Sequence, residues 1–350
     1  MPESPRSKGH LNPGSAGLRF DRFELGAGLS GLVRHVWVPR WSLPDGEVRP
    51  QRVLTYPAFN IVITPEYAAL FGPDSRVHVQ ELRGTSWAVG ILFRPAAGPL
   101  LTATDPVALA GSSEPLSATL VGATSAGAAS AGRIREVMAD SADHMAASVG
   151  SQGEIVRDQI VRILRDWLLP VAARVDDRGR LVNEACRLAE EDPDLTRAAD
   201  LAACLGVSPR SLERLVRSHT GLTPKWLIEC RRLQQAATTL FGSPDTDLSV
   251  LAADLGYTDY PHFFRQYQRV LGESPRATRD HRLMPQGARL RNRTHHSAPN
   301  CAIERPYPRD TRSPPPESNR SPIKSPCHRQ AGRPGAPPPK RPLALHLDTR

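Results

Sequence analysis

The sequence repeats one short pattern, and this repeat strongly restricts how that part of the chain can fold. Residues 201–206 (Leu-Ala-Ala-Cys-Leu-Gly) match residues 251–256 (Leu-Ala-Ala-Asp-Leu-Gly) at an offset of 50. One extra residue in the second copy then makes the offset 51, which aligns Arg214 with Arg265. Two copies form a tandem and not a solenoid, because stacked repeat arrays need at least about three units.

Each copy has the pattern of two short helices joined by a tight turn. In the first copy, apolar residues spaced for one helical face end at Gly206, a residue on which many helices terminate. Ser208 is then suited to cap the N-terminus of a second helix. The second copy repeats this order with Gly256 and a cap at Thr258 or Asp259. A helix, a glycine-containing turn and another helix form the helix-turn-helix pattern, whose second helix commonly enters a DNA major groove.

A longer helix is predicted between the copies, from Pro224 to Leu240, with apolar residues along one face. At about 1.5 Å per residue it is about 25 Å long. We expect it to hold the two second helices roughly 34 Å apart, one turn of DNA. A single chain would then read a bipartite site in successive major grooves.

This region resembles the DNA-binding domain of the AraC/XylS family of bacterial transcription regulators. The resemblance covers about residues 180–283 and is most specific at residues 251–257, 263–267 and 272–276. It implies an all-α domain with two helix-turn-helix motifs joined by a long helix. One departure is Thr278, which stands where the family usually has a tyrosine with a structural role.

The family's mode of docking implies which side chains face DNA. Arg214 and Arg265 are equivalent in the repeat, and arginine is well shaped for guanine O6 and N7, although both also suit a solvated helix face. Glu213 has two open roles, accepting from cytosine N4 or pairing with Arg217. Phe264 also has two open roles: it contacts a thymine methyl group, or it packs into the hydrophobic core. The candidate DNA-contacting residues are Arg210, Glu213, Arg214, Arg217, Tyr260, Pro261, His262, Phe264, Arg265 and Arg269.

The net charge of +9 does not by itself indicate nucleic-acid binding, because the tail supplies it. Residues 281–350 contain 14 Lys and Arg against 4 Asp and Glu, whereas residues 180–280 contain 13 against 14. Inside the balanced region, basic residues gather at 210–232, six against two, and at 265–279, four against one. Phosphate contact requires positive charge at these helices and not across the whole domain.

The N-terminal part has a different pattern, made of short runs of β-branched and aromatic residues between Pro and Gly. Such runs predict strands of a small sheet or barrel at residues 32–38, 59–63, 76–80 and 87–93. We expect a sensor-like effector or dimerisation domain, loosely similar to that of some regulators in the family. His35 and His78 fall in these strands without partners at metal-ligand spacing, so a structural role is expected.

The expected fold class is therefore α+β and multidomain, with a β-rich N-terminal domain and an all-α C-terminal domain. A helix is predicted from Glu154, with Ile155 on its buried face and Pro170 closing it. The low-apolar tail, which contains His295 and His296, either adds nonspecific DNA affinity or is a solvated extension or a read-through of the coding frame. The predicted divisions are a disordered N-terminus at 1–17, a β-rich domain at 18–150, a helical linker at 151–179, the tandem domain at 180–283 and a disordered Pro/Arg-rich tail at 284–350.

Other features argue against an enzyme. The five cysteines are odd in number with no pair at metal-binding spacing, so they predict reduced thiols in a cytoplasmic protein. We expect Cys186, Cys204 and Cys230 to be buried in helices, and Cys301 and Cys327 to lie in the tail. There is no Gly-rich phosphate loop, nucleophile elbow, metal quartet, secretory signal or apolar run of about 18 residues. We therefore expect no cofactor, no metal and no membrane partner.

These observations favour a cytoplasmic, sequence-specific regulator of transcription. Its expected partner is double-stranded promoter DNA, and RNA polymerase and an unidentified small-molecule effector are further candidates. The chain is expected to act as a monomer or a homodimer. The alternative is a small-molecule-binding protein or enzyme whose helical tandem is structural only, and selection of DNA from a randomised pool separates the two hypotheses.

Overall fold

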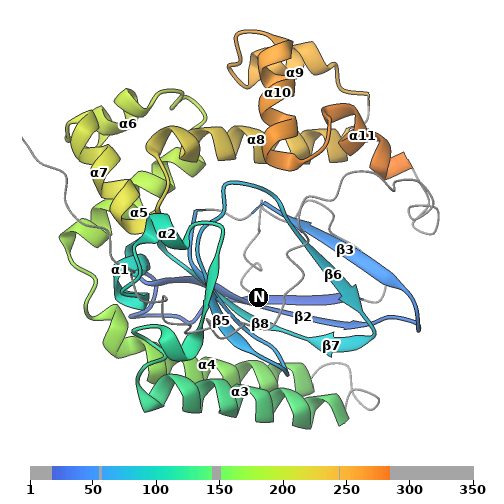
Figure 1. The fold of residues 1–350 in the computed structure, drawn as a ribbon, viewed down its shortest axis with the longest axis vertical. Helices are drawn as coiled ribbons and strands as arrows, with labels where there is room; N and C mark the ends of the chain where they lie inside the picture. Colours follow the sequence, from blue (N-terminus) through green and yellow to red (C-terminus); the bar gives the residue numbers. More distant parts are fainter. Residues whose placement is uncertain (1–17, 55–56, 144–150, 244, 284–350) are drawn as a thin grey trace, which may run out of the picture. The chain divides into compact units, whose positions relative to one another are not determined.

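The N-terminal region is built on an antiparallel sheet, as its β-branched and aromatic runs predict. The structure, a computed structural model, describes residues 18–54, 57–143, 151–243 and 245–283. The sheet has the strand order β1-β2-β8-β4-β5-β9, with β7 pairing with β2 (Figure 1). Its strands are β1 Leu18–Phe23, β2 Val33–Ser42, β4 Asn60–Ile63, β5 Ala68–Phe71, β7 Thr85–Trp87, β8 Val89–Phe93 and β9 Ser113–Pro115.

Two further strands, β3 Val48–Val53 and β6 His78–Arg83, pair with each other in a separate antiparallel sheet, here called the β3–β6 ribbon. The four predicted strands are confirmed as β2, β4, β6 and the β7–β8 pair, which is interrupted at Ala88. The strands β1, β3, β5 and β9 were not predicted. Charged residues or prolines dilute the β pattern in three of them, and β5 and β9 are very short.

One face of the larger sheet packs against two helices, α3 Ser125–Asp143 and α4 Ser151–Ala172. Ile61 is paired with Leu70 on one side and Ile91 on the other, and all three lie in this core. Four short elements follow β8 along the chain: η1 Pro95–Ala97, α1 Gly98–Leu101, α2 Pro106–Leu109 and η2 Leu116–Ala118. The first three contact α7 (Pro209–Thr220), and η2 contacts α3 and β5. The predicted ends of the chain, 1–17 and 284–350, lie outside the described residues, together with Cys301, Cys327, His295 and His296.

Two predictions about α4 are wrong in detail. Pro170 lies inside the helix, which continues to Ala172. Ile155 is 51% exposed, whereas Val156 is buried against the sheet. The buried face is fixed by contact at Val156, Ile160 and Ile163, so Ile155 falls one residue outside it.

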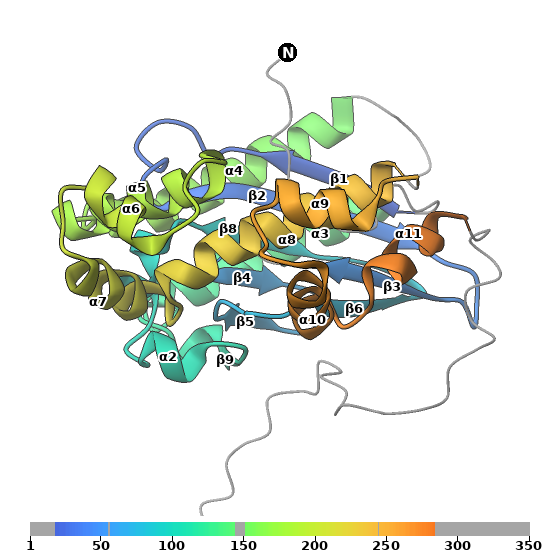
Figure 2. The same ribbon diagram turned by 90° about the horizontal axis from the view of Figure 1, so that it is seen from above.

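The helical region contains the predicted tandem and follows α4 directly. Its helices are α5 Asp177–Glu191, α6 Ala198–Cys204, α7 Pro209–Thr220, α8 Pro224–Gly242, α9 Leu248–Asp254, α10 Tyr260–Leu271 and α11 Pro275–Leu283. Helices α6 and α7 form the first helix-turn-helix, and α9 and α10 form the second. Figure 2 shows α8 running between them, as the sequence predicts. All described residues belong to one compact body.

The second helix of each motif begins at a capping residue that the sequence predicts and ends on a glycine. The Ser208 side chain accepts a hydrogen bond from the Ser211 N–H, and the Asp259 carboxylate accepts one from the His262 N–H. Both helices end on glycine in the left-handed region, Gly221 with φ of 72° and Gly272 with φ of 70°. Asp259, and not Thr258, is therefore the cap of α10.

Replacing Asp259 with alanine is expected to lower the free energy of unfolding by about 1 kcal/mol, because the cap satisfies an N–H that the helix cannot pair. Thr258→Ala is the matched control, since Thr258 is exposed and caps nothing, and it is expected to change stability by less than about 0.5 kcal/mol. Thermal or urea unfolding of the two variants measures the difference. Equal effects would contradict the assignment of the cap.

Each motif has its own hydrophobic core, and α8 contributes to both. The first core includes Leu201, Leu212 and Leu227, and the second includes Phe263 and Tyr267. The rings of Phe263 and Tyr267 meet edge to face with centroids 5.4 Å apart. Sharing α8 between the two cores links the position of one motif to that of the other.

The cysteine prediction is correct for two residues and wrong for one. Cys186 and Cys230 are buried, and burial raises the pKa of both thiols well above the ordinary value. Cys204 is exposed, because α6 turns Leu201 and Ala202 toward the core instead. Among the described helices, none combines the length and the apolar character that crossing a membrane requires.

Candidate nucleic-acid interface

The outward face of α7 carries four of the predicted DNA contacts. Leu212, Leu215 and Val216 are buried on the opposite face, which orients the helix. The exposed side chains are Arg210, Glu213, Arg214 and Arg217. Within the described part of the chain, Glu213 forms no ion pair with Arg217. Glu213 is exposed on the same outward face as the three arginines.

The outward face of α10 carries the corresponding contacts of the second motif. Phe263, Gln266 and Tyr267 are buried on its inner face. The exposed predicted residues are Pro261, His262, Arg265 and Arg269, and the half-buried ones are Tyr260 and Phe264. Each predicted site residue thus lies on one of the two second helices, four on α7 and six on α10.

The two phenylalanines of α10 have different environments. Phe263 is in the core, and its ring packs edge to face against Tyr257 with centroids 5.2 Å apart. Phe264 is half-buried, and its ring lies 6.1 Å from that of Tyr260. The Tyr260 and Phe264 rings therefore form an apolar patch at the edge of the interface, adjacent to exposed Arg265.

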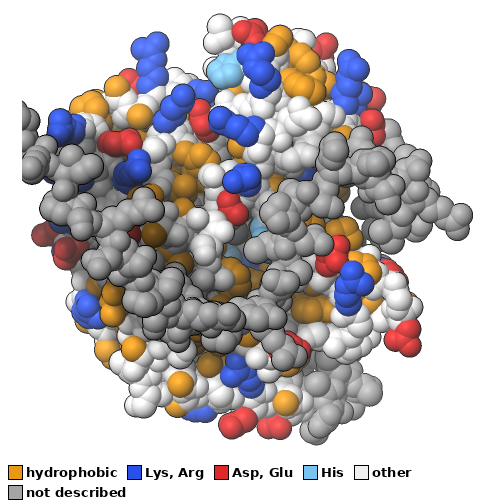
Figure 3. Space-filling model, in the orientation of Figure 1, with side chains coloured by type: hydrophobic (Ala, Val, Ile, Leu, Met, Phe, Trp, Pro, Cys, Tyr) orange, Lys and Arg blue, Asp and Glu red, His pale blue; other side chains and the backbone are white. Residues whose placement is uncertain are grey.

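The N-terminal end of α7 favours negative ligands more than that of α10. Neither helix has an acidic residue in its first turn. The positive end of the α7 dipole is therefore not compensated by a carboxylate in the first turn, a condition under which phosphate groups are stabilised, whereas α10 is capped by the Asp259 carboxylate. Figure 3 shows Lys and Arg side chains scattered over the surface of the helical region.

Two of the six basic residues between 210 and 232 do not belong to this surface. Arg231 is 6% exposed and donates through Nη2 to the Leu195 carbonyl at 2.9 Å. Arg232 donates to the Thr196 carbonyl, with its guanidinium 5.7 Å from the centre of the Tyr257 ring. Both hold α8 against neighbouring segments, so the sequence count of interface charge was too high.

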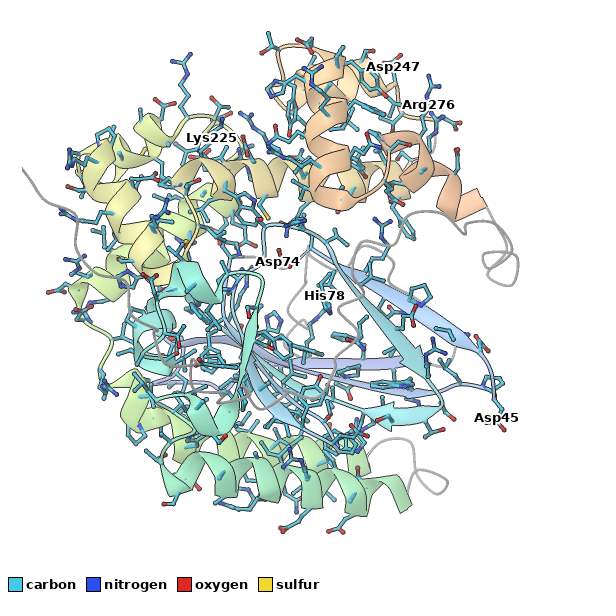
Figure 4. The ribbon with its side chains drawn as sticks, viewed as in Figure 1. Asp45, Asp74, His78, Lys225, Asp247 and Arg276 are labelled. Carbon is cyan, nitrogen blue, oxygen red and sulfur yellow. The ribbon has the colours of Figure 1, made fainter. Side chains whose placement is uncertain are left out.

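Two other basic residues near the motifs are exposed. Lys225, in the first turn of α8, lies 3.6 Å from Glu229, and Arg276 lies in α11 (Figure 4). Nothing local in the sequence marks Arg231 and Arg232 of α8 as bonded to neighbouring segments, because their partners Leu195 and Thr196 lie 36 positions away.

Thr278, which departs from the family pattern, makes a buried contact of its own. The Tyr267 hydroxyl donates to Thr278 Oγ1 at 2.8 Å, and the Thr278 hydroxyl donates to Glu273 Oε1 at 2.5 Å. Burial raises the pKa of Tyr267 well above its ordinary value, so its hydroxyl stays protonated and able to donate. The turn between α10 and α11 is closed by this chain of hydrogen bonds.

The two strand histidines lie in different sheets, His35 in the larger sheet and His78 in the β3–β6 ribbon. His35 is buried in β2, and burial, together with Arg34, Arg22 and Arg94, lowers its pKa to about 4. His35 is therefore neutral at pH 7. His78 begins β6 (Figure 4). Among the described residues, no group of three or more His, Cys, Asp or Glu side chains is placed to hold a metal ion.

Sequence reasoning missed Arg52, which contacts the second motif from β3. Its guanidinium pairs with Glu273 and donates to the carbonyl of Leu271 at 2.6 Å. Arg52 and Glu273 lie 221 positions apart, and no local sequence pattern around either residue predicts the ion pair.

Comparisons with known proteins identify two segments. Residues 201–281 match a family model described as a helix-turn-helix domain, and residues 24–115 match a domain of unknown function, DUF6597. The chain is 31% identical over 123 residues to the transcriptional activator NphR of a Rhodococcus species, which is 34% of this chain and 35% of NphR. It is 35% identical over 82 residues to the HTH-type transcriptional activator RhaS of Escherichia fergusonii, 23% of this chain and 29% of RhaS.

A solved transcriptional regulator from Chromobacterium violaceum, of the AraC-type DNA-binding domain-containing proteins, is similar over 30% of this chain and 95% of its own. The identity is 30% and the TM-score 0.28. The chain spans about a third of the length of the two curated relatives, 35% and 29%. Because the matched segment contains both motifs and the long helix between them, residues 201–281 are a helix-turn-helix domain of the AraC type.

Proposed function

We propose that this protein is a sequence-specific DNA-binding regulator of transcription that reads a bipartite promoter site. Helices α7 and α10 enter successive major grooves on one side of the duplex. The observation that carries the proposal is that two equivalent, capped helices each turn arginines outward from an AraC-type domain. Arg214 and Arg265 read base edges, because they occupy the same place in the two motifs.

The remaining candidates have supporting roles. Arg210, Arg217 and Arg269 contact phosphates, and these contacts position the helices without reading sequence. Glu213 accepts from cytosine, and the patch of Tyr260 and Phe264 contacts a thymine methyl group. Pro261 and His262 lie in the first turn of α10, where the chain approaches the backbone of the DNA.

The N-terminal region, 18–150, receives a signal or mediates dimerisation, and the helical stretch 151–179 connects it to the DNA-binding domain, 180–283. The larger sheet supports a sensing role because it forms a hydrophobic core of its own with α3 and α4, distinct from the cores of the two motifs. The chain acts in the cytoplasm as a monomer or homodimer, with RNA polymerase as a further candidate partner and no catalytic activity.

Selection from a randomised pool of double-stranded DNA by the full chain, at two salt concentrations, tests this function. The expected result is an enriched motif of two half-sites about 10 bp apart, centre to centre. Uniform, salt-sensitive binding without a motif would mean that the helices contact phosphates only. Absence of binding would favour the alternative in which the tandem is structural.

Replacing Arg217 with alanine is expected to weaken binding to all sequences about equally and to reduce the slope of log K against log salt by about 1. The reason is that a phosphate contact releases condensed counterions but carries no sequence information. Arg180→Ala is the control, because it removes the same charge from the exposed surface of α5, where Arg180 pairs with Asp177. An equal change of slope in both variants would contradict a specific phosphate contact.

A further inference from the structure

Segments outside the AraC-type domain complete the cores of both helix-turn-helix motifs. Leu54, which follows β3, is 0% exposed and belongs to the core of the second motif. Val77, which precedes β6, packs partly buried against the same core. Ala96 of η1 belongs to the core of the first motif. The N-terminal region is therefore built into the DNA-binding region at two separate places.

The β3–β6 ribbon is bonded to the C-terminal end of α10. Arg52 donates to the Leu271 carbonyl at 2.6 Å, and the Val77 N–H donates to the Val270 carbonyl at 2.9 Å. The last carbonyls of a helix have no partners within the helix and carry the negative end of its dipole. The ribbon thus supplies a cationic cap to the second recognition helix.

A buried ion pair extends this contact into the core of the second motif. Arg52 pairs with Glu273, whose side chain is 10% exposed. The same Glu273 oxygen accepts from the Thr278 hydroxyl, which in turn accepts from Tyr267 of α10. In addition, the Gln234 side chain of α8 donates to the Leu54 carbonyl at 3.1 Å. Displacement of the ribbon would therefore break contacts with α8, with the end of α10 and with Glu273, whose carboxylate is bonded to Thr278 of α11.

The first recognition helix is held at the corresponding end. A Cβ atom on Gly98 would come within 2.2 Å of the His219 carbonyl oxygen, and one on Gly221 within 2.4 Å of the Pro106 carbonyl oxygen. Helices α1 and α2 therefore lie directly against the C-terminal turn of α7. Separately, Arg34 of β2 pairs with Glu190 of α5 at 2.5 Å.

The DNA-facing sides of both helices stay open in this arrangement. Arg214 of α7 and Arg265 of α10 are exposed. The N-terminal region contacts these two helices at their C-terminal ends instead. The contacts of the N-terminal region thus position the helices without covering their outward faces.

We infer that the β3–β6 ribbon is an intramolecular clamp that sets the spacing of the two recognition helices and through which the N-terminal region regulates binding to the second half-site. The inference rests on the proposed function. With the ribbon docked, the helices are preorganised for one half-site spacing. Release of the ribbon frees α9–α11, so that the second half-site is bound weakly and over a wider range of spacings.

Arg52→Ala in the full chain tests the clamp, with Arg49→Ala as the matched control. Arg49 lies in the same strand and pairs with Glu47 of its own segment. The first readout is hydrogen exchange without DNA. Arg52→Ala is expected to speed exchange of the amides in α9, α10 and α11 while α6 and α7 exchange as in the wild type. Exchange that is unchanged in α9–α11, or equally faster in both variants, would overturn the inference.

The second readout is affinity for the selected bipartite site and for sites with the half-sites moved by one or two base pairs. We expect Arg52→Ala to lower affinity for the best spacing by at least roughly tenfold and to flatten the dependence on spacing, with affinity for the first half-site alone unchanged. If the affinity of Arg52→Ala depended on half-site spacing in the same way as that of the wild type, the clamp would be overturned, even though the wild type binds a bipartite site as proposed. A wild type without sequence preference would instead overturn the proposed function.

Glu273→Gln is a milder variant, because it keeps the size of the side chain and removes its charge. It is expected to reproduce the effect of Arg52→Ala in the same direction, and the double variant is expected to add little to either single change. Full additivity of the two changes would contradict coupling through the ion pair.

Discussion

Alanine in place of Phe263 is expected to lower the free energy of unfolding by about 3–5 kcal/mol, the range for loss of a buried aromatic side chain. Phe263 is at the centre of the second core, where its ring contacts Tyr257 and Tyr267 with centroids 5.2 and 5.4 Å away. The change leaves a cavity and removes two edge-to-face contacts. Urea unfolding followed by circular dichroism measures the loss.

Phe264→Ala is the matched control for this change, because it removes the same side chain one residue further on. Phe264 is half-buried, so its loss is expected to cost less stability than that of Phe263. It is instead expected to weaken DNA binding, since Phe264 belongs to the outward apolar patch with Tyr260. Similar losses of stability in both variants would contradict the division of α10 into an inner and an outer face.

Arg265→Ala is expected to cost about 1–3 kcal/mol of binding free energy and to relax base preference in one half-site only. The physical reason is the loss of a guanidinium placed to donate two hydrogen bonds to one guanine. Arg214→Ala is expected to have the same effect in the other half-site, because the two residues are equivalent in the repeat. Selection from the randomised pool by each variant measures the preference position by position.

The pattern of relaxation separates base contact from charge alone. Arg180→Ala removes one positive charge without altering either recognition helix, and it is expected to leave base preference intact at all positions. If Arg265→Ala instead weakened binding equally at every sequence, Arg265 would be a phosphate contact and the assignment of base reading to it would be wrong.

The helix-turn-helix motifs were predictable because their signals are local. Gly206 marks the end of the first helix and Ser208 the start of α7, and the repeat supplies the corresponding signals, Gly256 and Asp259, for the second motif. The outward positions follow from the burial of every third or fourth residue, whereas the ten candidate contacts were named from the mode of docking that the family resemblance implies. That they contact DNA remains a prediction, now with the exposure of each residue known.

Features that depend on distant contacts were not predictable. Ile155 and Cys204 were expected to be buried, yet the sheet and the first core accept the neighbouring residues Val156 and Ala202. Arg231 counted as interface charge, although its guanidinium is bonded inside the domain. Strand β3 contains Arg49, Pro50 and Arg52 and no alternating apolar pattern, so neither the strand nor the role of Arg52 could be predicted. In each case a partner far along the chain decides the outcome.

The most direct test of bipartite reading is the affinity of the full chain for its selected site before and after insertion of 5 bp between the half-sites. Half a helical turn places the second half-site on the opposite side of the duplex, out of reach of α10 when α7 is bound. We expect the affinity to fall to that for the first half-site alone. We expect a 5 bp insertion outside the two half-sites to leave the affinity unchanged. Unchanged affinity after the 5 bp insertion would contradict the central claim that one chain reads both half-sites.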